Sequence, residues 1–370
     1  MKLRAEILLV LSVFAVQVRS QGTDWPIFRG TGDLTGKTAW TLPDQPRLLW
    51  SWNSGSSTKS SPVISDGTVY FGTDKGALIA VAPDGKLSWK KDAGNPIESP
   101  PMVYMNYIIF STSDGKLMAA DKSTGKTIWT YLTENQIAGS ANWWNKGSAS
   151  GIVVGSYDYY LHCVNPVTGK TLWKLLTENY INGTPCIAGS RILFGGCDGV
   201  VRIVDPTSGK QKDSVEIGSY IASSPAVTGD LAWFGDYDGN FFCLNIASGK
   251  MVWNRNPGQD GGSILSVPAV SSGFVVIGND NGTLSCYKAT DGTLIWKFRA
   301  GGSIKGSAVI SGDRVLFGSE DGYIYLLSLN DGRKIWSFKT GTPVISSPAV
   351  TRDRFYILSG DGRLMAFGIK

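Results

Sequence analysis

The chain alternates short apolar runs with tight turns, in a pattern that repeats along most of its length. Residues 60–64 (Ser-Ser-Pro-Val-Ile) are followed by a turn and by a second run, Thr68–Gly72. Most units continue with an Asp-Gly or Asn-Gly pair and a third run, such as residues 117–121. A Thr-Gly-Lys or Ser-Gly-Lys turn then leads to a fourth run. Because Asp-Gly and Asn-Gly between β-rich runs are strong hairpin signals, each unit is predicted to be a four-stranded antiparallel meander.

The fourth run of nearly every unit carries a tryptophan, which allows the copies to be counted. Successive tryptophans are 39, 40, 44, 80, 43 and 40 residues apart. The interval of 80 residues contains one further copy, in which Asp213 stands at the tryptophan's position. A large ring at this position is expected to pack against the neighbouring unit and to have a structural role. The seven members of this tryptophan ring are Trp50, Trp89, Trp129, Trp173, Trp253, Trp296 and Trp336.

Eight copies of one meander predict an all-β, eight-bladed β-propeller, because a single sheet cannot bury both of its faces and must pack against its neighbours. The last copy starts at residues 346–348, and the chain ends before a fourth run. The segment 47–52 precedes the first complete copy. This N-terminal strand is therefore expected to complete the last blade, so that the propeller spans residues 47–370.

The N-terminus has the features of a secretory signal. Lys2 and Arg4 precede an apolar run, residues 7–16, that is too short to span a bilayer. A signal peptide, residues 1–20, is predicted to be cleaved near Ser20, and residues 21–46 form a lead-in to the propeller. No cysteine follows the apolar run, so a lipoprotein is not expected, and no other run predicts a transmembrane segment.

Charge and cysteine content give little sign of further chemistry. The net charge of +5 is too small to indicate a nucleic-acid partner. Cys163, Cys243 and Cys286 share one repeat position that alanine holds in other copies, which indicates a small packing residue. Cys186 and Cys197 lie in one unit and could pair, although all five cysteines are interpreted as packing residues.

The repeated Ser-Ser-Pro-Ala-Val (residues 223–227 and 346–350), the Asp-Gly turn and the Thr-Gly-Lys-x-x-Trp segment together resemble the PQQ-like, or tryptophan-docking, propeller repeat. The resemblance covers about residues 47–370, and residues 24–30 resemble the segment that precedes such propellers in exported bacterial proteins. Relatives include quinoprotein dehydrogenases and the outer-membrane-protein assembly factor BamB, which the chain resembles most in size and character. Because a fold hosts several functions, the resemblance alone does not decide between them.

The dehydrogenase relatives imply a bound quinone, PQQ, with a calcium ion, an aspartate base and commonly an adjacent cysteine pair. This chain has no Cys-Cys pair, no Cys-x-x-Cys-His and a single histidine, His162, which falls in an apolar run and is interpreted as structural. Its repeated aspartates occupy hairpin turns, where Asp supports turn geometry. We therefore expect no catalytic residues, no metal site and no cofactor, with PQQ and calcium as the alternative.

Two features depart from the repeat and are the candidate partner-binding sites. In each connection from a fourth strand to the next first strand, one position is apolar in nearly every copy. The residue after it varies from copy to copy, and these eight residues are expected to surround the mouth of the central channel. Their polar members are Lys59, Glu98, Asn182 and Lys305. The copy of 44 residues gains a longer first hairpin that carries Trp143 and Trp144, a candidate aromatic anchor for a protein or a glycan.

These observations favour a non-enzymatic, extracytoplasmic scaffold, secreted or periplasmic, that binds another envelope or secreted protein as a monomer. A role like that of BamB, in cell-envelope or outer-membrane protein assembly, is the leading hypothesis. The alternatives are a propeller that binds a small molecule or a glycan, and a PQQ-dependent dehydrogenase.

Overall fold

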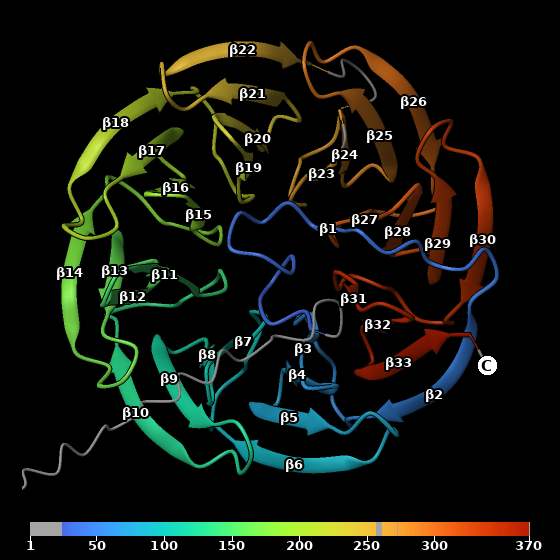
Figure 1. Ribbon diagram of the computed structural model, residues 1–370, viewed down its shortest axis with the longest axis horizontal. Helices are drawn as coiled ribbons and strands as arrows, with labels where there is room; N and C mark the ends of the chain where they lie inside the picture. Colours follow the sequence, from blue (N-terminus) through green and yellow to red (C-terminus); the bar gives the residue numbers. More distant parts are fainter. Residues whose placement is uncertain (1–23, 257–260, 272, 370) are drawn as a thin grey trace, which may run out of the picture.

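The computed structural model describes residues 24–256, 261–271 and 273–369. These residues form eight four-stranded antiparallel blades around a central axis, with no helix among them (Figure 1). The predicted all-β eight-bladed propeller is confirmed. The predicted signal peptide, residues 1–20, lies outside the described residues.

Each blade runs outward from the axis, with its first strand innermost and its fourth strand outermost (Figure 1). Blade 1 contains β3 (Val63–Ser65), β4 (Thr68–Gly72), β5 (Ala77–Val81) and β6 (Leu87–Asp92). Blade 2 contains β7 (Met102–Tyr104), β8 (Tyr107–Ser111), β9 (Lys116–Asp121) and β10 (Thr127–Leu132). Blade 3 contains β11 (Asn142–Lys146), β12 (Ala149–Gly155), β13 (Tyr160–Val164) and β14 (Thr171–Leu176). Blade 4 contains β15 (Cys186–Ala188), β16 (Arg191–Gly195), β17 (Val200–Val204) and β18 (Gln211–Glu216).

The second half of the ring repeats this arrangement. Blade 5 contains β19 (Ala226–Thr228), β20 (Leu231–Gly235), β21 (Phe241–Asn245) and β22 (Lys250–Arg255). Blade 6 contains β23 (Ala269–Ser271), β24 (Phe274–Gly278), β25 (Thr283–Lys288) and β26 (Leu294–Arg299). Blade 7 contains β27 (Val309–Ser311), β28 (Arg314–Ser319), β29 (Tyr323–Ser328) and β30 (Lys334–Lys339), and β1 (Lys37–Thr38) adds to it in parallel. Blade 8 contains β31 (Ala349–Val350), β32 (Arg354–Leu358), β33 (Arg363–Gly368) and β2 (Arg47–Asn53).

Blade 8 joins the two ends of the propeller. Strand β2 pairs antiparallel with β33, and Trp50 lies opposite Ala366. The predicted closure, in which an N-terminal strand completes the last blade, is therefore confirmed. Closure of this kind leaves no gap in the ring at which neighbouring blades would lack a partner.

The outer tryptophans connect neighbouring blades. In six of them the indole Nε1–H donates a hydrogen bond of 2.7–3.1 Å to a backbone carbonyl in the last turn of the next blade. The ring also covers a glycine of that turn: a Cβ atom on Gly125 would lie only 2.8 Å from the ring of Trp89. The seventh, Trp336, packs against Phe355 and Phe367 of blade 8. Each tryptophan thus fixes the distance between two blades.

A second layer of inter-blade contacts lies nearer the axis, where each blade begins. One residue of each fourth-to-first-strand connection is buried there: Thr58, Ile97, Ile137, Ile181, Ile221, Ile264, Ile304 and Val344. Ile97 lies against Gly72 at the end of a strand in the preceding blade, so close that a Cβ atom on Gly72 would lie 2.2 Å from Cγ2 of Ile97. These eight buried residues therefore form a layer that packs across the blade boundaries.

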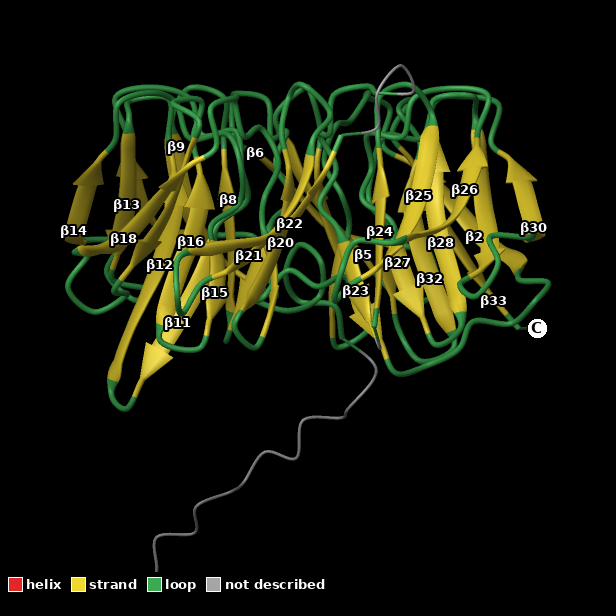
Figure 2. Cartoon of the chain, turned by 90° about the horizontal axis from the view of Figure 1, so that it is seen from above, coloured by secondary structure: helices red, strands yellow, loops and turns green. Residues whose placement is uncertain are grey.

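The lead-in crosses the centre of the propeller on the side away from these connections (Figures 1 and 2). The innermost strands of six blades donate backbone N–H groups to its carbonyls, over 2.7–3.0 Å. The donor and acceptor pairs are Ile64 to Trp25, Val103 to Pro26, Ile187 to Gly32, Val227 to Asp33, Val270 to Thr35 and Ile310 to Gly36. The lead-in is therefore an integral part of the fold that contacts blade after blade around the axis.

Arg29 anchors the middle of the lead-in. Its side chain is buried, and its guanidinium donates hydrogen bonds to the carbonyl of Ala308 over 2.5 Å and to that of Pro268 over 3.1 Å. Burial lowers its pKa to about 9, which leaves it charged at neutral pH. No carboxylate within the described ranges forms an ion pair with Arg29, so backbone carbonyls alone stabilise this buried charge.

Candidate functional site

The variable residues of the eight connections surround a cavity on the propeller axis. The cavity measures about 210 Å³, and Phe28 of the lead-in contributes to its lining. The eight residues of this mouth ring are Lys59, Glu98, Ala138, Asn182, Ala222, Leu265, Lys305 and Ile345. The structure therefore places all four polar candidates from the sequence at one site, although their binding role stays a prediction.

The charges of the mouth ring are paired. Lys59 Nζ lies 2.7 Å from Glu98 Oε1, and this hydrogen bond raises the pKa of Lys59. Lys305 Nζ lies 2.9 Å from Oε1 of Glu320, which lies outside the ring. Asn182 donates from Nδ2 to Cys197 Sγ over 3.0 Å, while its Oδ1 is buried without a hydrogen-bond partner in the described part of the chain. Of the four candidates, only Lys59 and Glu98 contact one another.

Below the ring, the Ser-Ser-Pro motif forms a belt of hydroxyl groups. The N–H of Thr184 donates to Ser224 Oγ over 2.7 Å, and the N–H of Ser347 donates to Ser61 Oγ over 2.8 Å in the next blade. Equivalent bonds link other neighbouring blades, and the belt is interrupted at Pro100 and Val267, which have no hydroxyl. The motif therefore connects the blades.

The two adjacent tryptophans lie on opposite sides of blade 3. Trp144 is 4% exposed and packs in the core between blades 3 and 4. Trp143 is half-buried, and its ring lies 5.6 Å from that of Tyr104 in blade 2. Both border a groove of about 700 Å³ between the lead-in and the first hairpins of blades 4 and 5. Trp144 is thus largely a core residue, and any anchoring contact falls to Trp143.

The five cysteines are free thiols. Cys186 donates from Sγ to the carbonyl of Asp33 in the lead-in over 3.3 Å, and Cys197 accepts the Asn182 bond. The alternative that Cys186 and Cys197 pair is therefore not realised. Burial raises the pKa of the Cys163, Cys243 and Cys286 thiols to about 12, so these thiols are not reactive.

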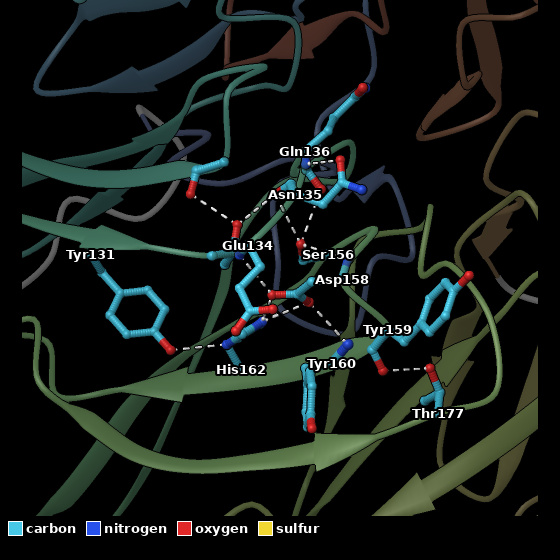
Figure 3. Close-up of polar contacts among 12 residues, drawn as sticks. Tyr131, Glu134, Asn135, Gln136, Ser156, Asp158, Tyr159, Tyr160, His162 and Thr177 are labelled. Carbon is cyan, nitrogen blue, oxygen red and sulfur yellow. Dashed lines mark hydrogen bonds and ion pairs between the residues drawn. The ribbon is translucent and has the colours of Figure 1, made fainter.

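The only histidine joins a buried hydrogen-bonded chain that links blades 2 and 3 (Figure 3). Tyr131 Oη lies 2.9 Å from His162 Nδ1, and His162 Nε2 lies 3.0 Å from both carboxylate oxygens of Asp158. Burial lowers the pKa of His162 more than the Asp158 carboxylate raises it. A neutral ring that donates from Nε2 to Asp158 and accepts at Nδ1 from Tyr131 satisfies every contact.

The same side-chain pairing recurs in two other blades. Arg202 lies four residues after Asp198 and contacts its Oδ2 over 2.7 Å. Tyr325 lies four residues after Asp321 and donates to its Oδ2 over 2.6 Å. His162 and Asp158 have the same spacing and the same place in the blade. In each of the three blades the side chain contacts the turn aspartate four residues before it, so this contact supports the hairpin turn.

The sequence matches the protein family described as outer membrane protein assembly factor BamB over residues 30–255 and 257–370. The chain belongs to the BamB family. It shares the fold of BamB from Moraxella catarrhalis at 17% identity and a TM-score of 0.76, over 88% of this chain and 100% of that one. No curated protein matches the sequence.

Two dehydrogenases of known structure have the same propeller fold. A europium-containing methanol dehydrogenase matches at 12% identity with a TM-score of 0.84, covering 94% of this chain and 98% of that one. A quinohemoprotein alcohol dehydrogenase from Comamonas testosteroni matches at 14% identity with a TM-score of 0.80, covering 94% and 80%. At these identities the likeness shows the fold alone, so this BamB-family chain needs its own test for a cofactor site.

The lining of the axial cavity is a poor match for a calcium ion. Calcium in proteins usually takes about six to eight oxygen ligands, and carboxylates supply some of them. The cavity lining supplies one carboxylate, Glu98, and Lys59 already pairs with it. No group of three or more His, Cys, Asp or Glu side chains in the described residues could hold a metal ion.

No helix in that part of the chain is long and apolar enough to cross a membrane.

Sequence reasoning missed a cluster of exposed tyrosines on the same face as the mouth ring. Tyr159, Tyr180, Tyr220 and Tyr237 are 39%, 38%, 59% and 54% exposed. They lie in the connections and in the turns between second and third strands of blades 3 to 5. One signal was present in the sequence: Tyr159 follows a turn aspartate where the other units have glycine.

Proposed function

We propose that this BamB-family chain is a non-enzymatic, extracytoplasmic scaffold that binds another protein during outer-membrane protein assembly. The mouth ring carries this proposal. Ligand pockets measure roughly 300–1,000 Å³, whereas the axial cavity measures about 210 Å³, and its charged rim residues are already paired. The site therefore suits contact between surfaces better than enclosure of a cofactor or substrate.

An extracytoplasmic location rests on the predicted signal peptide and on the family. The basic residues and the apolar run of residues 1–20 have the form of a secretory signal. The family's description places its members in outer-membrane protein assembly. A location outside the cytoplasm is the simplest one that agrees with both.

The proposal is tested by purifying the full-length chain from detergent-extracted envelopes of its source organism. We expect a defined outer-membrane assembly protein to co-purify, and we expect deletion of the gene to change the set of outer-membrane proteins. An isolated chain together with an unchanged envelope would contradict the scaffold role. Dye-linked oxidation of alcohols after incubation with PQQ and calcium would instead support an enzyme.

The groove beside Trp143 favours a second candidate, the binding of a glycan or another small molecule. Its volume of about 700 Å³ lies within the range of ligand sites, and its lining includes the ion pair between Arg191 and Asp230. Thermal unfolding in the presence of an oligosaccharide panel tests this function. A shift that is lost in Trp143→Ala and in Arg191→Ala would support it, and no shift with any sugar would contradict it.

A further inference from the structure

Five tyrosines form an arc over blades 3 to 5 on the mouth-ring face. This tyrosine arc consists of Tyr157, Tyr159, Tyr180, Tyr220 and Tyr237. The rings of Tyr157 and Tyr180 stack at 4.6 Å, and that of Tyr159 lies 5.3 Å from Tyr180. The N–H of Tyr237 donates to the carbonyl of Tyr220 over 2.9 Å. Stacking and backbone bonds therefore hold exposed aromatic rings on a rigid support.

Tyr159 adopts a backbone conformation that favours glycine. Its φ is 73°, and the equivalent residue in each of the other seven blades is a glycine with φ of 73–85°. The seven glycines are Gly76, Gly115, Gly199, Gly239, Gly282, Gly322 and Gly362. A side chain costs free energy at such a position. Because Tyr159 is 39% exposed, burial does not account for a side chain at this position, whereas contact with a partner would account for it.

An exposed leucine extends the arc toward the rim. Leu176 ends β14 and is 60% exposed. It lies opposite Tyr160, and its neighbour Thr177 donates its N–H to the Tyr159 carbonyl over 2.8 Å. Blade 2 has Leu132, 65% exposed, at the same repeat position. The other six blades have polar residues there: Asn53, Asp92, Glu216, Asn256, Arg299 and Lys339.

Four acidic residues border the arc. Glu134, Glu178, Glu216 and Asp238 are exposed beside these tyrosines and at the ends of the adjoining outer strands. None of the four forms an ion pair with another residue that the structure describes. The nearby cation Lys174 lies over the ring of Tyr160 at 4.7 Å. The surface thus carries unpaired negative charge, and a lysine of the chain itself already contacts a tyrosine ring beside it.

We propose that the tyrosine arc and its acidic border bind a basic segment of a partner protein, in which Lys or Arg alternates with apolar residues. This inference rests on the proposed scaffold function. Tyrosine offers large contact area at low entropic cost, and its ring attracts cations. The four carboxylates are complementary to Lys and Arg, and Leu176 offers an apolar contact beside them.

The experiment uses the purified full-length chain and a fluorescein-labelled peptide of alternating Arg and Leu, followed by fluorescence anisotropy. We expect the peptide to bind and the affinity to fall with added salt. Tyr220→Ala combined with Tyr180→Ala should weaken binding by about tenfold, and Glu178→Gln combined with Glu216→Gln should also weaken it. Met105→Gly is the matched control, because Met105 is exposed, has φ of 53° and lies on the opposite face.

Several outcomes would overturn the inference. These are equal binding of the same peptide with Glu in place of Arg, unchanged affinity in the tyrosine variants, and no binding at all. Preferential binding of malto- or chito-oligosaccharides at Tyr220 would assign the arc to glycans instead. Thermal unfolding of each variant confirms that Tyr220→Ala, an exposed change, leaves the fold intact.

A photo-crosslinking arm separates this inference from the scaffold function. Benzoylphenylalanine is placed at position 220 in one variant and at position 105 in another, and each is expressed in the source organism. A partner that crosslinks at position 220 and is lost with Glu178→Gln and Glu216→Gln supports the arc. A partner that crosslinks only at position 105 overturns the arc and leaves the scaffold standing. A chain that crosslinks at neither position and co-purifies with nothing contradicts both.

Discussion

Asp213 faces Gly249 across the boundary between blades 4 and 5, at the place where other blades have a tryptophan ring over a glycine. A Cβ atom on Gly249 would lie 2.9 Å from Asp213 Oδ2, whereas one on Gly209 would lie 2.5 Å from the ring of Trp173. Asp213 is exposed, and its Oδ1 accepts a hydrogen bond from the N–H of Ser214. Blade 5 therefore keeps the glycine, Gly249, against which a tryptophan of blade 4 would pack, although blade 4 has Asp213 in place of that tryptophan.

Replacing Asp213 with tryptophan should stabilise the protein. The new ring would cover Gly249, and its indole N–H would reach the carbonyl of Ile246, which is in the same sequence relation as Pro206 is to Trp173. We expect Asp213→Trp to raise the free energy of unfolding by about 1 kcal/mol. Urea denaturation measures this change. Lys212→Trp, on the neighbouring exposed position, is the control, and an equal gain there would show that the docking site is irrelevant.

Removing the side chain at Tyr159 should also stabilise the protein, because glycine adopts a φ of 73° without a steric cost. We expect Tyr159→Gly to raise the free energy of unfolding by about 0.5–1 kcal/mol after the entropic cost of glycine is subtracted. Met105→Gly should give a similar gain on the other face. Gly199→Ala, which introduces a side chain at the equivalent turn, should lower stability, and a neutral result would argue against backbone strain at this turn.

The burial of His162 makes the stability of the protein depend on pH. Burial lowers the pKa of His162 in the folded protein below its ordinary value of 6.5, so the unfolded chain binds a proton at a higher pH. The contribution of neutral His162 to the free energy of unfolding is therefore fully present above pH 6.5. It is lost as the pH drops from 6.5 through the lowered pKa. The pKa of Asp158 lies below its ordinary 3.8, because hydrogen bonds from His162 and the backbone outweigh its burial, so its effect begins at lower pH.

His162→Gln tests this pH dependence, because glutamine keeps an N–H donor toward Asp158 and does not titrate. Thermal unfolding between pH 7 and pH 5 should show a smaller loss of stability in the variant than in the wild type. Tyr131→Phe, which removes the other contact of the ring, is expected to keep the pH dependence. An identical slope in His162→Gln and the wild type would assign it to other groups.

Arg29 should be essential for docking of the lead-in. Arg29→Ala leaves the carbonyls of Ala308 and Pro268 without their donors and opens a cavity, which we expect to cost about 2–4 kcal/mol. Urea denaturation measures the loss, and limited proteolysis between residues 24 and 46 reports release of the segment. Lys37→Ala, an exposed change in the same segment, is the control. Equal protease resistance in both variants would contradict the anchoring role.

The propeller could be predicted from the sequence because its information is periodic. A tryptophan every forty residues or so, with Asp-Gly turns between, defines the blades, and two incomplete units at the chain ends define the closing strand β2. The mouth ring could be located in the same way, since counting from a repeated residue leads to the same loop in every blade. Residues at the same repeat position lie at the same place in every blade, and all eight ring positions therefore line one cavity.

The remaining features depend on contacts that have no period. The lead-in binds through its own backbone carbonyls, whose partners in six blades leave no sequence pattern. The exposure of Tyr220 depends on what surrounds one loop, and the pairing of Lys305 with Glu320 depends on side-chain reach within one blade. The sequence shows that Tyr159 stands where other units have glycine. Only its φ of 73° shows that the tyrosine adopts the backbone conformation that glycine favours.

The closing strand also sets the order in which the molecule can be completed. Strand β2 lies near the start of the chain, and β33 lies at its end. Because synthesis proceeds from the N-terminus, β2 leaves the ribosome long before β33 does. During that interval β2, the outer strand of blade 8, has no partner. Completion of blade 8 must therefore await the last strand of the chain, and a chain interrupted before β33 would leave β2 without its antiparallel partner.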